Sequence, residues 1–193
     1  PTKTTGKYLT VEELHNWYSQ GREFYMVDMR NDYEYISGHF ENSILSEFKN
    51  FRDLPSILPK LEHLKDKTIV TCCTGGVRCE KASGFLVENG FADVYQLKDG
   101  IQTYMETYPN KHFKGKLYVF DGRITLGFNT DSPEHEIIAN CIKCGVKCDS
   151  YVNCQNLRCH KHYICCSDCR DKETNMYFCD EDCRTKALLS MKQ

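Results

Sequence analysis

The stretch of sequence that decides the fold is TIVTCCTGGVRC, residues 68–79. Residues 68–72 are mostly apolar or β-branched, which predicts a buried strand. Gly75 and Gly76 predict a loop after that strand, and the spacing of apolar residues predicts a helix from Cys79 onward. Because ligands of open α/β sheets bind at the carboxyl ends of the strands, this loop is a candidate functional site.

The flanking sequence continues the alternation of strand and helix. Thr10 and Glu13 fit a capping box, in which a hydroxyl and a carboxylate bind free amides at the start of a helix. Buried strands that alternate with helices predict an α/β fold, with a parallel sheet flanked by helices on both faces. The expected domain covers 6–108, with helices over 10–21, 79–89 and 101–108 and strands over 24–29, 68–72 and 94–97.

Cys73 is the candidate nucleophile of the loop. Amide groups of the loop and of the following helical turn would converge there and favour an anion. A thiolate at this position, with Arg78 beside it, would have a lowered pKa and react as a nucleophile. Cys72 continues the strand and is expected to be a small buried residue. Cys79 has two interpretations, a packing residue or a second thiol that forms a disulfide with an oxidised or persulfidated Cys73.

The remaining cysteines are concentrated in a tail, residues 141–193. Ten of the thirteen cysteines lie there, at short spacings that suit a tetrahedral metal. We expect two structural zinc ions, and an interleaved arrangement would let the first and third pairs share one ion. An iron–sulfur cluster is the alternative, and Cys148, His160, His162 and Cys165 are substitute ligands. The expected pairs are Cys141 and Cys144, Cys154 and Cys159, Cys166 and Cys169, and Cys179 and Cys183.

Composition narrows the class of protein. The polar residues Pro1–Lys7 do not resemble a secretory signal, and the number of cysteines is odd. Both observations argue against a secreted protein with a disulfide framework and favour the reducing cytoplasm. A net charge of −2 does not indicate a polybasic protein, and no apolar run of about 18 residues could cross a membrane. No dinucleotide or P-loop motif occurs, so no organic cofactor is expected. Residues 109–140 are expected to form a linker with a strand at Leu117–Phe120 and a short helix that begins at Asp131.

Two further stretches resemble the rhodanese family. Residues 28–43, DMRNDYEYISGHFENS, resemble its first signature, and this resemblance implies that Arg30 and Glu34 brace the fold. Residues 73–78 resemble the six-residue rhodanese active loop, whose first residue carries a persulfide. The run 73–81, followed by VYQLKDGI at 94–101, is similar to the rhodanese-containing tRNA uridine hydroxylases.

That resemblance implies oxygen-dependent hydroxylation of the wobble uridine of tRNA, position 34, to 5-hydroxyuridine. Cys73 would be the reactive thiol, with Arg78 and Cys79 as further catalytic residues. The implied partners are tRNA, molecular oxygen and a sulfur donor or thiol reductant, and no membrane is expected. Family members usually carry a small α/β domain ahead of the rhodanese segment, which this sequence is expected to lack. The loop residues implied to contact substrate are Thr74, Gly75, Gly76 and Val77.

Three other functions are compatible with the sequence. A sulfurtransferase would carry a persulfide on Cys73, and a non-catalytic zinc-containing interaction module would leave the loop unused. Counted from Cys72, the spacing to Arg78 matches dual-specificity phosphatases of rhodanese-like fold, whose wider loop admits a phosphate. The phosphatase hypothesis requires Cys72 to leave the strand and point into the loop.

Overall fold

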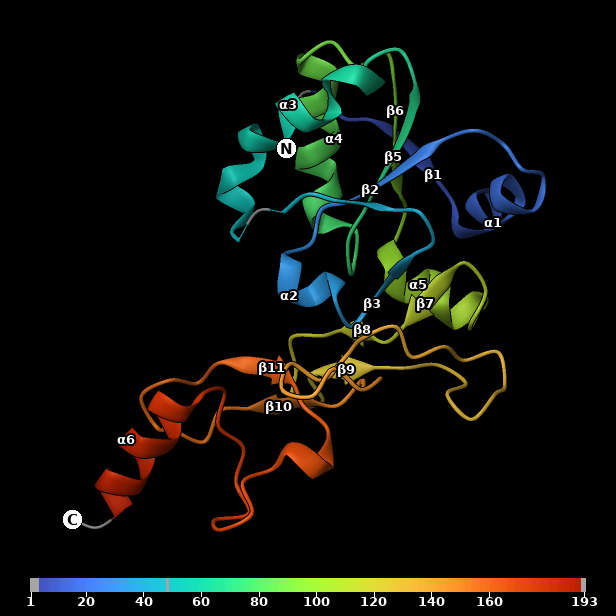
Figure 1. The fold of residues 1–193 in the computed structure, drawn as a ribbon. Coiled ribbons are helices and arrows are strands. Elements are labelled where there is room, and N and C mark those ends of the chain that lie inside the picture. Colours follow the sequence, from blue (N-terminus) through green and yellow to red (C-terminus); the bar gives the residue numbers. More distant parts are fainter. Residues whose placement is uncertain (1–3, 48, 192–193) are drawn as a thin grey trace. The chain divides into compact units, whose positions relative to one another are not determined.

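The computed structural model describes residues 4–47 and 49–191. The chain divides into two compact units, Pro1–Glu136 and Ile137–Gln193, and each is described by itself (Figure 1).

The first unit is built on a five-stranded parallel sheet with the strand order β1-β6-β5-β2-β4. Figure 1 shows β5, which leads into the loop of Cys73, between β2 and β6. The predicted α/β sheet is therefore confirmed. Its strands are β1 (Lys7–Leu9), β2 (Tyr25–Asp28), β4 (Ile44–Leu45), β5 (Thr68–Cys72) and β6 (Asp93–Leu97).

Helices cover both faces of this sheet, and successive strand residues feed two separate cores because side chains alternate along a strand. One core joins the sheet to α1 (Val11–Ser19) and α5 (Gly100–Thr107), which contribute residues such as Leu14 and Tyr104. The other core joins it to α4 (Val77–Glu88) and α3 (Leu58–Leu61), with a 3₁₀ turn on either side of α3, over Phe51–Ile57 and Glu62–Leu64.

The helix ends follow the expected local chemistry. The capping box of α1 is present, with the Glu13 amide donating to Thr10 Oγ1 at 3.2 Å and the Thr10 amide donating to the Glu13 carboxylate at 2.8 Å. Helix α4 begins at Val77, two residues before the predicted start, so Arg78 and Cys79 lie in its first turn.

Residues 109–136 belong to the first unit. Strand β7 (Phe113–Gly115) pairs antiparallel with β3 (Gly38–Phe40), which follows the short helix α2 (Asp32–Tyr35). Strand β8 (Leu117–Tyr118), shorter than predicted, pairs with β9 (Thr125–Leu126).

The short helix predicted at Asp131 is wrong. Residues 131–134 form turns, in which Ser132 Oγ accepts from the Glu134 amide at 3.2 Å. Apart from Pro133, residues 129–136 are polar, so a short helix there would have no apolar face to bury.

The second unit holds a small antiparallel hairpin of β10 (Tyr151–Asn153) and β11 (His162–Ile164), and it ends in α6 (Glu181–Met191). Its core is a cluster of cysteines packed around a few large side chains, among them Tyr163, Ile164 and Phe178. So small an apolar core usually needs a covalent or metal staple.

Gly100 allows the loop of Cys73 to close against α5. A Cβ atom on Gly100 would lie 2.5 Å from the Thr74 carbonyl oxygen, and its φ of +76° is itself unfavourable for other residues. The close approach lets the Ile101 and Gln102 amides donate to the carbonyls of Cys73 and Thr74, at 2.9 and 3.1 Å. The first turn of α5 therefore fixes the backbone of the loop through these two hydrogen bonds.

We expect Gly100→Ala to lower the free energy of unfolding by roughly 3 kcal/mol, because backbone strain and a clash with backbone atoms add. Gly90→Ala is the matched control, since Gly90 has a φ of +85° but nothing within 4 Å of the added carbon. Its expected cost is about 1 kcal/mol. Urea unfolding of both variants decides the point, and equal losses would contradict the close contact.

Candidate active site and metal centres

Cys73 lies where β5 ends, at the wall of a cavity of about 530 Å³. Cys72 and Cys73 face opposite sides of the sheet, because Cys72 belongs to the core under α1 and α5 and Cys73 to the core under α4. Cys73 is almost fully buried, with 1% of its surface exposed. A small reagent or a substrate must therefore reach its sulfur through the cavity.

The surroundings of the Cys73 sulfur lower the pKa of this thiol to about 6. The largest cause is the hydrogen bond from the Cys79 thiol; the charge of Arg78 and the backbone amides of Cys79 and Arg78 act in the same direction, against the effect of burial. Burial raises the pKa of Cys79 far above its ordinary value, so Cys79 stays protonated and remains a donor. At neutral pH the arrangement holds a thiolate beside a thiol.

Arg78 makes its side-chain contacts away from the sulfur. Its Nη1 and Nη2 atoms donate to the fully buried carboxylate of Glu34, at 2.7 and 2.8 Å. The same carboxylate accepts from Thr74 Oγ1 at 3.4 Å and from the Asn31 amide at 3.0 Å. Arg78 thus acts on Cys73 through its backbone amide and its field, while its side chain fixes the loop to α2.

Arg30 lies in a separate buried network. Its guanidinium donates to Asp28 at 2.6–3.1 Å and to the Gly38 carbonyl at 2.7 Å. This pairing ties the end of β2 to the start of β3, and neither charged side chain is exposed. Glu34 meets this network only through its backbone carbonyl, which accepts from Arg30 at 3.4 Å.

The phosphatase alternative finds no support in this geometry. Cys72 stays within β5, is fully buried, and its pKa is raised well above the ordinary value, chiefly by burial. A nucleophile there would have to leave the sheet.

The cavity also contains residues that the sequence patterns did not single out. The expected loop residues Thr74, Gly75 and Val77 line it, whereas Gly76 is the N-cap residue of α4, with a φ of +84°. Lys49, Phe51 and Phe120 contribute as well. The side chains of Val77 and Phe120 are 79% and 68% exposed, an unusual exposure for apolar residues beside a reactive group. Only their apolar character next to turn residues could have indicated them beforehand.

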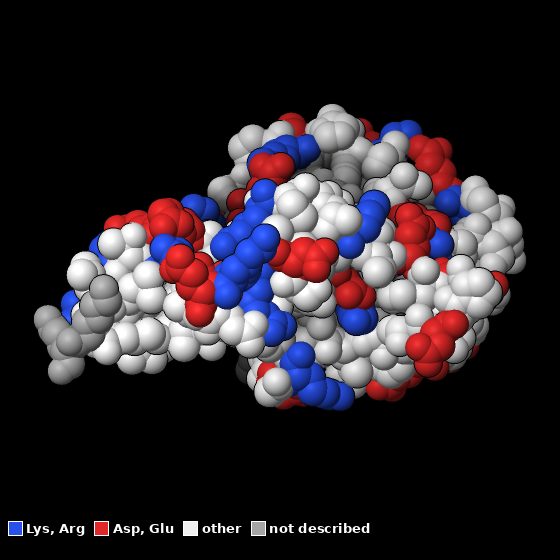
Figure 2. All heavy atoms as spheres, turned by 60° about the horizontal axis from the view of Figure 1, so that its bottom comes forward, with Lys and Arg blue, Asp and Glu red and all other residues white. Residues whose placement is uncertain are grey.

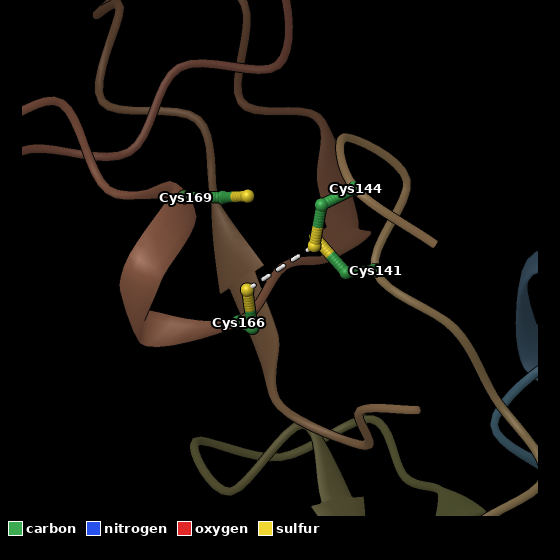
Figure 3. A group of neighbouring side chains, drawn as sticks. All are labelled: Cys141, Cys144, Cys166 and Cys169. Carbon is green, nitrogen blue, oxygen red and sulfur yellow. Dashed lines mark hydrogen bonds between the residues drawn. The ribbon is translucent and has the colours of Figure 1, made fainter. Parts of the chain in front are cut away.

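The tail brings its cysteine pairs together in two groups of four, in which all sulfurs lie within 4.8 Å of one another. Cys141 and Cys144 meet Cys166 and Cys169, so the first and third pairs share one centre, and Figure 3 shows the four sulfurs converging. The second group is Cys154, Cys159, Cys179 and Cys183.

The sulfur spacings fit zinc. A tetrahedral site with Zn–S bonds of about 2.3 Å places its sulfurs about 3.8 Å apart. The distance from Cys144 Sγ to Cys166 Sγ is 3.6 Å, and that from Cys159 Sγ to Cys179 Sγ is 3.7 Å. Each group could hold one metal ion through four thiolates, which is a closed and structural arrangement.

The substitute ligands lie outside both groups. Among the residues that the structure describes, neither group includes Cys148, Cys165, His160 or His162. Cys148 Sγ instead accepts from the Ser150 amide at 3.4 Å.

No helix within 4–47 or 49–191 is long and apolar enough to span a bilayer.

Comparison with known families gives the same picture. The rhodanese-like domain family matches residues 10–107, and the family described as rhodanase C-terminal matches residues 114–184. The chain therefore belongs to the rhodanese-like domain family. It resembles solved rhodanese-like domains from Anabaena (18% identity, 63% of this chain and 86% of that one, TM-score 0.48) and Staphylococcus aureus (27%, 51% and 90%, 0.44).

Within that family, the chain is similar to proteins named tRNA uridine(34) hydroxylase. The protein from Cytophaga hutchinsonii is 42% identical over 95% of this chain and 57% of its own length. Those from Photorhabdus laumondii (42%, 98% and 53%) and Staphylococcus carnosus (40%, 92% and 60%) are comparable. The chain thus spans little more than half the length of these relatives.

The donor role of Cys79 predicts how the reactivity of Cys73 changes with pH. Alkylation of Cys73 by iodoacetamide, followed on its own peptide by mass spectrometry, should fall as the pH drops through about 6. Cys79→Ala removes the donor, so the midpoint should move up toward the ordinary thiol value of about 8.5. Cys79→Ser keeps a donor and should stay closer to the native midpoint. Identical curves for all three proteins would exclude the donor role.

Metal content tests the two sulfur groups. We expect two zinc ions per chain by elemental analysis, and Cys141→Ser should lower this to one because a four-ligand site loses a ligand. Cys148→Ser, outside both groups, should keep both ions. Equal zinc contents of Cys141→Ser and Cys148→Ser would contradict the assignment of the ligands to the two groups.

Proposed function

We propose that this chain carries out hydroxylation of the wobble uridine of tRNA at C5, with Cys73 as the reactive thiol. The observation that carries the proposal is the similarity to tRNA uridine(34) hydroxylases, 42% over 95% of the chain, which runs through both the thiolate loop and the cysteine tail. The donors around Cys73 support a thiol-based reaction.

The cavity suits one unpaired nucleotide. Its volume of about 530 Å³ admits a base and its sugar, and Phe51 and Phe120 offer aromatic faces. Lys49 supplies a positive charge for a phosphate. An enzyme that reacts at C5 needs the base out of its stack, because the reacting atom must reach the sulfur at the cavity wall.

The electron balance gives Cys79 a role. Dioxygen would place one oxygen atom at C5 of uridine and leave the other as water, which requires two further electrons. Cys73 and Cys79, whose thiols interact closely enough for Cys79 to lower the pKa of Cys73, would supply these electrons by closing a disulfide. The proton of the Cys79 thiol and one proton from solvent would go to the water. A thiol reductant would then restore the dithiol. We place this cycle in the cytoplasm, where tRNA and reduced thiolates occur together.

Zinc would have a structural part in this function. Two ions held by four thiolates each would complete the small core of the tail, and a closed ligand set leaves no position for substrate. The tail would then serve as a rigid second unit of the same enzyme.

Sulfur transfer is the second candidate. The six-residue loop and its amides would also stabilise a persulfide on Cys73, the reaction implied by the rhodanese signature. The two reactions differ in their product on tRNA, either an oxygen or a sulfur substituent.

Nucleoside mass spectrometry of tRNA separates these functions. Cells that lack the gene would be complemented with the native gene, with Cys73→Ala or with Cys72→Ala. Only the Cys73 change should abolish 5-hydroxyuridine, because Cys72 lies in the core on the other face of the sheet.

Three other results are informative. Loss of thiolated nucleosides with unchanged 5-hydroxyuridine would indicate sulfur transfer. Unchanged nucleosides in the Cys73→Ala strain would indicate a non-catalytic interaction module. Equal loss with both variants would point to instability and not to a reactive Cys73.

A further inference from the structure

Three exposed aliphatic residues of the tail are each followed by a basic residue. Ile142, Val146 and Leu157 have 51%, 52% and 83% of their surface exposed. They precede Lys143, Lys147 and Arg158, which are exposed as well. Both sulfur groups therefore lie beside a loop that presents apolar and positively charged side chains side by side.

The first of these loops, residues 141–148, is rigid. The Cys141 amide donates to the Val146 carbonyl at 2.8 Å, and the Gly145 amide donates back to the Cys141 carbonyl at 2.9 Å. The Ile142 amide binds the carbonyl of Ile164 at the end of β11, at 3.0 Å. A loop fixed in this way needs little ordering of its backbone on binding.

The second loop, residues 154–161, connects β10 to β11 at the other end of the hairpin. It is closed by the hydrogen bond from the Cys154 amide to the Lys161 carbonyl, at 2.9 Å. The buried Asn156 side chain accepts from the Arg158 amide at 3.2 Å, which turns the backbone at Leu157 outward. The apolar tips are thus held apart by the length of the hairpin.

The charges of this part of the chain are unbalanced. Residues 137–165 contain four basic residues and one acidic residue. Of the four basic side chains, Lys161 acts on the carboxylate of Asp180, whose pKa it helps to lower. Outside this range, Arg184 pairs with Asp171 and Glu173. Figure 2 shows basic side chains gathered in a band on the face drawn, with basic and acidic side chains interspersed elsewhere on it.

We propose that these two loops form a binding surface for single-stranded RNA, in which the aliphatic tips contact unpaired bases and the basic side chains contact phosphates. The proposal rests on the proposed function, since a tRNA anticodon loop offers both kinds of group. Three apolar side chains separated by charges make no continuous patch for a protein partner or for a bilayer. Unpaired bases offer apolar faces one at a time, along a chain of phosphates.

The lysines have an ordinary alternative role. A zinc ion with four thiolates carries a net charge of −2, and a nearby lysine lowers the cost of that charge. The test must therefore distinguish loss of RNA binding from loss of metal.

Binding of the zinc-loaded 193-residue chain to a 17-nucleotide anticodon stem-loop RNA, measured by fluorescence anisotropy over a range of salt, tests the surface. The double change Lys143→Gln and Lys147→Gln should weaken binding on the order of tenfold and reduce the salt slope by about 1.4, because each lost contact to a single strand removes about 0.7. The double change Ile142→Ser and Val146→Ser should weaken binding roughly fivefold and leave the slope unchanged.

Two controls make the result decisive. Leu189→Ser and Lys186→Gln, on α6, change an exposed aliphatic residue and a cation already paired with Asp182, and binding should stay native. Zinc content should stay at two ions in every variant. Native affinity in both loop variants overturns the proposal. The double change Lys143→Arg and Lys147→Arg keeps the charge and should restore binding. If the glutamine variant loses zinc and the arginine variant binds RNA no better, the proposal is also overturned. Equal affinity for a blunt duplex RNA would also overturn it.

Binding and chemistry can fail independently. The affinity measurement uses Cys73→Ser as well as the native chain, because the surface is expected to bind RNA without a reactive thiol. If RNA binds the loops and no 5-hydroxyuridine forms, the proposed reaction fails and the surface stands. If 5-hydroxyuridine forms at the native rate in the lysine variant, the surface has no part in the reaction.

Discussion

The ion pair between the buried carboxylate of Glu34 and the partly exposed Arg78 is the interaction on which the rest of the site depends. It joins α2, which follows β2, to the first turn of α4, and so ties the two ends of the reactive loop to the sheet. A buried carboxylate without its partner would cost on the order of 3 kcal/mol, so the pair resists separation. Since the pair holds Arg78 in place, the amides of Arg78 and Cys79 stay directed at the Cys73 sulfur.

The sequence predicted those parts of the molecule that local patterns determine. Strand β5 and the capping box of α1 are as expected, because each depends on neighbouring residues alone. The resemblance at 28–43 indicated Glu34 as a bracing residue, but its pairing with Arg78 could not be predicted, since the two residues lie 44 positions apart. The same holds for the pairing of β7 with β3, and for Gly100, which is required only because α5 returns to the loop.

The tail follows a different rule. Its cysteine spacings indicate which cysteines act as pairs. The structure brings the first pair, Cys141 and Cys144, together with the third pair, Cys166 and Cys169, as the interleaved arrangement predicts. Spacing alone did not indicate which cysteines stay outside: Cys148 and Cys165 both lie at the open end of the hairpin, where the Cys165 amide donates to the Ser150 carbonyl. On the proposed function, the exposed loop tips of the hairpin and the thiolate at the cavity wall would each contact a different portion of one RNA.

The measurement that tests the central claim most directly is isotope labelling of the product. The native chain and Cys73→Ser would each be incubated with unmodified tRNA and a thiol reductant under ¹⁸O₂, and the nucleosides analysed by mass spectrometry. We expect 5-hydroxyuridine that carries one ¹⁸O atom, formed by the native chain alone. An oxygen atom derived from water, or equal product from Cys73→Ser, would contradict it.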